Sequence, residues 1–157
     1  MKHLFEEKFN EPIGLKIEYF SFLFSIKENA KEPILAWMKT SDSIWHRFFI
    51  DAWMPHWNAT NTEESKEYYE TEIIEDYIKE ELEDYQSEDG DKWEEVNILE
   101  AFDLINKKII NAESKHIELN GFWCTQLNIE IENNNEIILN DYCDEKESEL
   151  IINGIKL

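Results

Sequence analysis

A strict two-residue alternation between positions 123 and 132 restricts the fold more than any other feature of the sequence. One set of residues comprises Trp123, Thr125, Leu127, Ile129 and Ile131, and the set between them comprises Cys124, Gln126, Asn128, Glu130 and Glu132. A period of two places the two sets on opposite sides of a β-strand. The sequence therefore predicts a half-buried strand here.

The residues that follow predict an antiparallel partner for that strand. Asparagines 133–135 favour a turn, because Asn tolerates left-handed backbone angles. A second strand is expected over 136–140, and a third over 148–156.

The first two-thirds of the chain predicts helices instead. Helices are expected from Pro33 to about Lys39, from Ile44 to Met54 before Pro55, from 62 to about 86, and from 92 to 111. Residues 15–28 fit a buried helix or a strand, and the helix is favoured. The predicted fold is α+β in one domain, 1–157. Residues 1–113 would be mainly helical and packed with a C-terminal antiparallel hairpin or small sheet over 114–157.

Composition bounds the class of protein. The chain has 157 residues, of which 42% are hydrophobic and 13% aromatic, enough for one folded domain with its own core. The N-terminus carries acids where a signal peptide needs an apolar stretch, and residues 19–26 are too few to span a membrane. We therefore expect a cytoplasmic protein. Whether Cys124 and Cys143 form a disulfide across a hairpin or remain thiols is open.

Negative charge is concentrated in one segment. The net charge is −21, and the segment from Glu63 to Glu100 holds 17 acidic residues against three lysines, a charge of −14 in 38 residues. Tyrosines recur among these acids at helical spacing, which indicates an ordered acidic face. This charge disfavours direct binding of nucleic acid or of an anionic membrane. It favours a cationic protein partner, brought in by electrostatic steering.

The acidic segment supplies the predicted partner-binding residues. On a helical wheel, Glu72, Asp76 and Glu83 lie opposite the apolar stripe, whereas Glu70 and Glu81 fall among its tyrosines and isoleucines. Part of that tyrosine-rich face is therefore expected to bind a partner, unless the two glutamates lie at the edge of the buried zone. The predicted contact residues are Glu70, Glu72, Glu75, Asp76, Tyr77, Glu80, Glu81, Glu83, Asp84, Glu88, Asp89 and Asp91.

No motif in the sequence carries a recognisable chemistry. The loop at Asp89-Gly90-Asp91 fails the EF-hand pattern, because the positions that should hold the first and last ligands are Tyr85 and Val96. His46 and His56 lie ten residues apart, unlike helical metal ligands at three- or four-residue spacing. The sequence therefore predicts no catalytic residue, no cofactor and no metal.

In size, acidity and lack of a signal or catalytic motif, the chain resembles bacterial toxin-immunity proteins of the contact-dependent-inhibition type. The resemblance lies in overall character and transfers no residue. It implies a protein that covers the basic active-site groove of a cognate toxin domain, in particular a nuclease. Two alternatives remain open. One is a nucleic-acid mimic whose acids, including Glu80 to Asp84 and Glu94-Glu95, replace phosphates. The other is an enzyme of unrecognised type centred on Trp37 to Trp57, with a pocket at His46 or His56.

Overall fold

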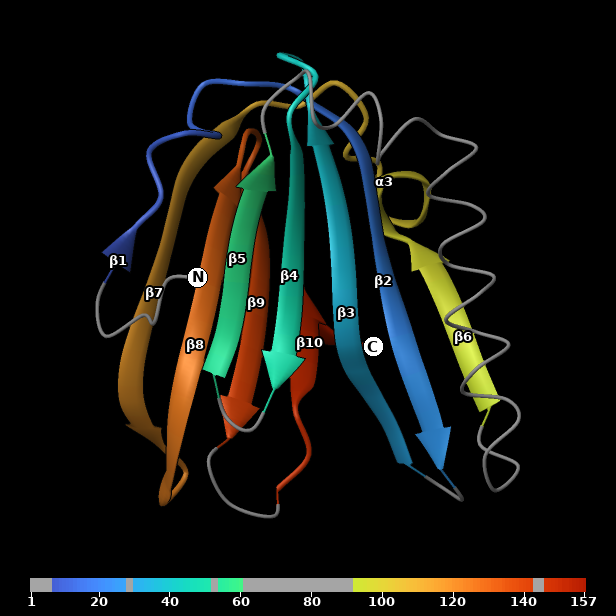
Figure 1. The fold of residues 1–157 in the computed structure, drawn as a ribbon, viewed down its shortest axis with the longest axis vertical. Coiled ribbons are helices and arrows are strands. Elements are labelled where there is room, and N and C mark those ends of the chain that lie inside the picture. The colour runs from blue at the N-terminus through green and yellow to red at the C-terminus, as the bar shows by residue number, and fades with distance from the viewer. Residues whose placement is uncertain (1–6, 28–29, 52–53, 61–91, 143–145) are drawn as a thin grey trace.

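Two antiparallel β-sheets make up the described part of the chain (Figure 1). The structure, a computed structural model, describes residues 7–27, 30–51, 54–60, 92–142 and 146–157. Of these residues, 66% lie in strands and 4% in a helix. The prediction of an α+β fold with a mainly helical N-terminal two-thirds is therefore wrong.

The two sheets contain six and five strands. The first has the order β1 (Glu7–Lys8), β7 (Ile109–Leu119), β8 (Phe122–Ile131), β9 (Asn135–Tyr142), β10 (Glu149–Ile152) and β11 (Ile155–Lys156). The second has the order β5 (Met54–Thr60), β4 (Trp45–Asp51), β3 (Ala30–Thr40), β2 (Ile17–Lys27) and β6 (Lys92–Asn97). The short helix α3 (Ile98–Ala101) follows β6.

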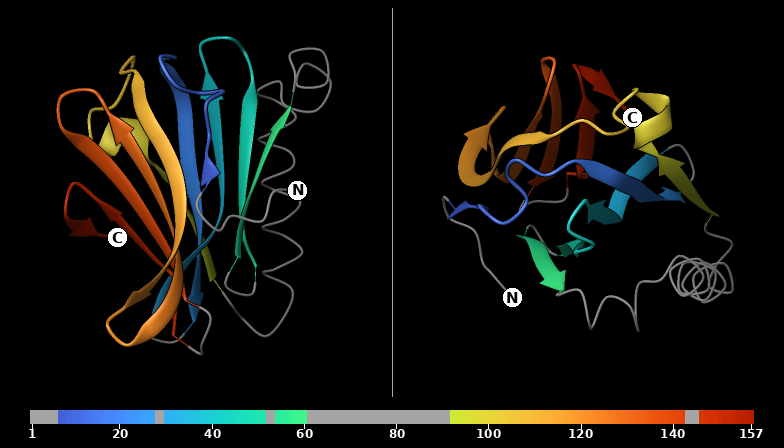
Figure 2. Two further views of the ribbon diagram at one scale, coloured as in Figure 1. Left: turned by 90° about the vertical axis from the view of Figure 1, so that its left-hand side faces the viewer. Right: turned by 90° about the horizontal axis from the view of Figure 1, so that it is seen from above.

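The sheets pack as two layers around one core, as the views from the side and from above show (Figure 2). Phe20, Phe22 and Phe24 of β2 meet residues such as Leu127 and Ile129 of β8 in this core. Burial of apolar side chains from both inner faces is the main stabilising contribution to such a sandwich.

Residues Ile17–Lys27 form strand β2, although their sequence also fits a buried helix. Its consecutive residues from Phe20 to Ser25 are all buried, so both faces of the strand are covered. A strand covered on both faces has no polar side to alternate with its apolar side, and its near-continuous apolar run cannot be told from a buried helix by periodicity. The favoured helix over 15–28 is therefore wrong.

The next two predicted helices are also strands. Pro33 lies in β3 beside an irregularity in the β2–β3 register, where Leu23 pairs with Leu35 and Phe24 pairs with Pro33. Proline is tolerated at such bulges, since one residue there leaves the ladder. The helix expected over 44–54 is replaced by β4 and the first residue of β5.

The helix predicted over 92–111 is broken into β6, α3, a loop and the start of β7. Asn97 caps the N-terminus of α3, because its side-chain Oδ1 accepts a hydrogen bond from the Leu99 N–H at 3.0 Å. Asp103 and Asn106 then adopt positive φ angles of 54° and 61°, which end helical geometry. The helix predicted over 62–86 lies outside the described residues.

The strands expected after Ser114 are present. Strands β8 and β9 pair from Cys124–Tyr142 to Ile131–Asn135, and Asn133 and Asn134 turn the chain between them with φ angles of 65° and 59°. In place of the single third strand expected over 148–156, the structure has two short strands, β10 and β11, separated by a turn at Asn153 and Gly154.

Candidate functional site

The predicted partner-binding residues cannot be placed. All twelve, from Glu70 to Asp91, lie outside the described residues. Of the acidic segment that ends at Glu100, the described part contains Glu94, Glu95 and Glu100, and all three are exposed.

Glu94 and Glu95 lie on β6, the last strand of the five-stranded sheet as described. Glu94 pairs with Lys31 Nζ at 3.3 Å, and Glu95 accepts a hydrogen bond from the Tyr19 hydroxyl at 2.8 Å. Both interactions are at the surface, where an ion pair contributes at most about 1 kcal/mol. The two carboxylates thus remain accessible to a stronger cationic partner.

The same two glutamates point to opposite sides of their strand. Glu94 is paired in register with the core residue Phe24, and Glu95 with Leu23 on the other side of β2. Successive residues of a strand alternate in this way. Glu94-Glu95 therefore does not form the row of acids on one surface that the nucleic-acid-mimic interpretation requires, and the run from Glu80 to Asp84 lies outside the described residues.

A row of polar side chains crosses the inner face of the six-stranded sheet. His116 of β7 is in register with Thr125 of β8, which is in register with Asp141 of β9. His116 Nδ1 lies 3.4 Å from Thr125 Oγ1, and Ser148 Oγ donates to Asp141 Oδ1 at 2.8 Å. Asp141 is only 3% exposed. Carboxylates are rarely buried without a polar network, so this row is an unusual feature of the inner face as described.

The row lies between the apolar core and solvent. On the same face of β8, Leu127 is buried in the core, Thr125 is buried in the polar row, and Trp123 is 52% exposed. The Trp123 ring stacks on the His116 ring, with centroids 5.2 Å apart and planes 2° from parallel. The β7–β8 hairpin therefore presents an aromatic pair to solvent where it leaves the core.

A second polar network covers the outer face of this sheet. Asn140 Nδ2 and the Tyr142 hydroxyl both donate to Glu149 Oε1, at 3.0 and 2.6 Å, and Lys156 Nζ lies 3.5 Å from Glu149 Oε2. Burial raises the pKa of the Tyr142 hydroxyl, as does its hydrogen bond to Glu149. Burial alone would raise the pKa of Glu149, but these donors and Lys156 hold it below its usual value. These hydrogen bonds and this ion pair link the side chains of β9, β10 and β11.

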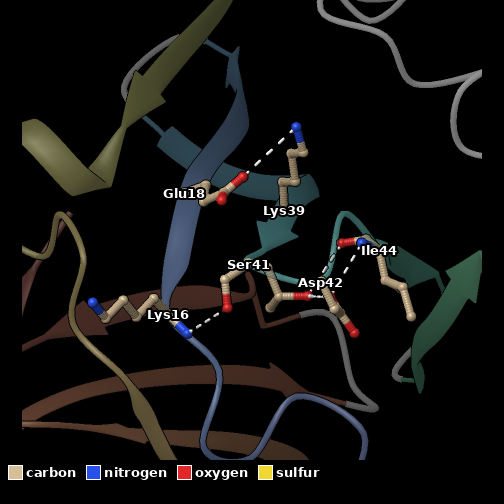
Figure 3. A network of polar contacts seen from close by, with 7 residues as sticks. Lys16, Glu18, Lys39, Ser41, Asp42 and Ile44 are labelled. Atoms are coloured by element: carbon tan, nitrogen blue, oxygen red, sulfur yellow. Dashed lines mark hydrogen bonds and ion pairs between the residues drawn. The ribbon is translucent and has the colours of Figure 1, made fainter. Parts of the chain in front are cut away.

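His46, a focus of the enzyme alternative, is buried near the β3–β4 turn. Figure 3 shows the turn itself, where the Ile44 N–H donates to Asp42 Oδ1 at 3.2 Å. Thr40 Oγ1 donates to Asp42 Oδ1 at 2.6 Å and lies 3.2 Å from His46 Nε2. Burial lowers the pKa of His46 to about 4, against the opposing attraction of Asp42. His46 is 1% exposed, so burial holds its ring neutral and the described structure opens no path from solvent to it. The side chain of His56 lies outside the described residues.

Sequence reasoning missed the polar row and the aromatic pair. The sequence around His116 matches no recognisable motif, and Asp141 is one of many acidic residues. One signal was available: Thr125 interrupts an otherwise apolar set between Trp123 and Leu127. The row itself depends on the register of three strands, which the sequence does not show.

Three further observations concern metal binding, membrane spans and similarity to known proteins. Among the described residues, no three His, Cys, Asp or Glu side chains are grouped so as to hold a metal ion. None of the described helices combines the length and apolar character needed to cross a membrane. Comparisons with models of protein families, with curated proteins and with solved structures give no match to this chain.

Proposed function

We propose that this protein binds a cationic protein domain and neutralises it, as an immunity protein does for its toxin. A nuclease is the partner that its charge suits best, because a nuclease carries a basic groove for phosphates. One observation carries the proposal. The segment from Glu63 to Glu100, with its charge of −14, includes strand β6, the last strand of the five-stranded sheet as described. The two carboxylates of β6, Glu94 and Glu95, are exposed.

Electrostatics explains how such a surface would work. Complementary charge raises association rates above the ordinary range of about 10⁵–10⁶ M⁻¹s⁻¹ and disfavours partners of like charge. Carboxylates that form charge-assisted hydrogen bonds to Arg and Lys then slow dissociation. The Lys31 ion pair of Glu94 is a weak surface contact. A partner's guanidinium can replace it at little cost.

The gene beside the one for this protein provides the test. We expect it to encode a basic domain that arrests bacterial growth, and we expect co-expression of this protein to restore growth. The purified pair should associate more slowly as salt is raised from 50 to 200 mM. A neighbouring product that is acidic, or growth arrest that this protein does not relieve, would contradict the proposal.

Two matched variants test the part played by β6. Glu94→Lys and Glu113→Lys each reverse one carboxylate and each break one surface ion pair, to Lys31 at 3.3 Å or to Lys115 at 3.1 Å. Glu113 lies on β7, in the other sheet. We expect E94K to slow association roughly tenfold and E113K to slow it only slightly. Equal slowing by both variants would exclude β6 as the contact surface, provided that both unfold at the wild-type temperature.

A further inference from the structure

The end of the β7–β8 hairpin combines three side chains that suit one kind of ligand. Trp123 and His116 form the stacked pair described above, and Glu118 lies directly opposite Trp123 in the β7–β8 register. Residues opposite each other in an antiparallel pair project to the same face, with Cβ atoms about 5 Å apart. An exposed indole therefore lies beside an exposed carboxylate.

We propose that Trp123, His116 and Glu118 form an anchoring site for an arginine side chain of the cationic partner. This inference rests on the proposed function and names a contact within it. Trp123 is 52% exposed, so the indole offers surface that His116 does not cover. Partly exposed tryptophans on a rigid support are characteristic of the residues that dominate binding energy in protein interfaces.

The chemistry favours arginine over other ligands that stack on aromatic rings. A guanidinium is planar and cationic, so it stacks on an indole while its edge donates to a carboxylate. Lysine carries its charge at a point and cannot match both surfaces. A nucleotide would stack equally well, but its phosphate would be repelled by Glu118 and by the net charge of −21.

The site is held in shape before any ligand arrives. The His116 ring is fixed by its stacking and by the 3.4 Å approach of its Nδ1 to Thr125 Oγ1, and Thr125 is buried. The hairpin register is set by a two-residue turn at Asn120 and Gly121, whose φ angles of 53° and 83° match the twist of antiparallel strands. An anchor that is already ordered loses little conformational entropy on binding.

Octa-arginine and octa-lysine peptides are suitable probes, with binding measured by calorimetry at low salt. We expect wild-type protein to bind octa-arginine more tightly than octa-lysine. W123A should weaken octa-arginine binding roughly fivefold and remove the preference, and E118Q should weaken it about twofold. I110A is the matched control, because Ile110 is 54% exposed on the same hairpin and carries no ring.

The outcomes separate this inference from the proposed function. W123A could bind octa-arginine as the wild type does, while E94K weakens binding to the neighbouring gene's product. The proposed anchoring site would then be wrong, and the proposed function would stand. If Trp123 instead binds a neutral oligosaccharide such as maltohexaose and ignores octa-arginine, the ligand class assigned here is wrong. If neither peptide binds and the neighbouring product does not bind, the proposed function fails as well.

Discussion

At the scale of single residues, His46 shows how burial decides the state of a titratable group. Its Nε2 lies 3.2 Å from Thr40 Oγ1, and the hydroxyl hydrogen of Thr40 is directed to Asp42. Nε2 must therefore carry the proton and donate to Thr40, which assigns the neutral tautomer. Burial keeps the ring in that form by lowering its pKa from 6.5 to about 4.

This shift predicts a loss of stability in mild acid. The unfolded chain takes up a proton near pH 6.5, whereas the folded protein resists it until about pH 4. Stability should therefore fall as the pH drops through this window, by about 2 kcal/mol at pH 5 from His46 alone. Urea unfolding of the wild type and of His46→Gln at pH 7.5 and pH 5 measures this contribution. Equal losses in both proteins would show that His46 is not the group responsible.

At the scale of the elements, glycine turns set the registers of two hairpins, and the β7–β8 hairpin carries the proposed anchoring site. Gly121 has a φ of 83° in the β7–β8 turn and Gly154 has a φ of 79° in the β10–β11 turn. A Cβ at either position would contact nothing within 4 Å, so the cost of alanine at both is conformational strain alone. The strain of a left-handed backbone is about 1–2 kcal/mol for a residue with a Cβ.

Replacing each of the two glycines by alanine should nevertheless cost the protein different amounts of stability. Gly121 joins strands of 11 and 10 residues, so G121A cannot relieve its strain without opening the hairpin. Gly154 precedes a strand of two residues, which can fray locally. We expect G121A to lower the free energy of unfolding by about 1–2 kcal/mol and G154A by less, as measured by urea unfolding. A larger cost for G154A would contradict this order.

The elements also show where sequence patterns inform and where they do not. The alternation between Trp123 and Glu132 predicts β8 correctly because one face of that strand is apolar and the other mostly polar. The run from Phe20 to Ser25 carries no such contrast, since both of its faces are buried. The candidate sites follow from strand register: His116 meets Thr125, and Glu118 meets Trp123, only once β7 and β8 are paired. A single sequence does not contain that pairing.

At the scale of the whole molecule, the net charge of −21 opposes folding. Like charges held on one compact body repel each other more than they do along an unfolded chain. The described surface also has attractive pairs, such as Lys31–Glu94 and Lys115–Glu113, but exposed pairs contribute at most about 1 kcal/mol each. With 36 acidic residues against 15 basic ones, repulsion should outweigh attraction. The acidic surface is therefore maintained at a cost to stability, which is consistent with a role in binding.

This balance predicts that salt stabilises the protein. Raising NaCl from 20 mM to 0.5 M shortens the Debye length from roughly 20 Å to about 4 Å, which screens repulsion across the molecule more than contacts at 3–4 Å. We expect the free energy of unfolding to rise by about 1 kcal/mol or more, measured by urea titration at pH 7.5. The double variant E113K/E130K changes the net charge by four, from −21 to −17, and should respond less to salt. A fall in stability with added salt would mean that the surface ion pairs dominate, and it would remove the argument that the excess acid is kept for a partner.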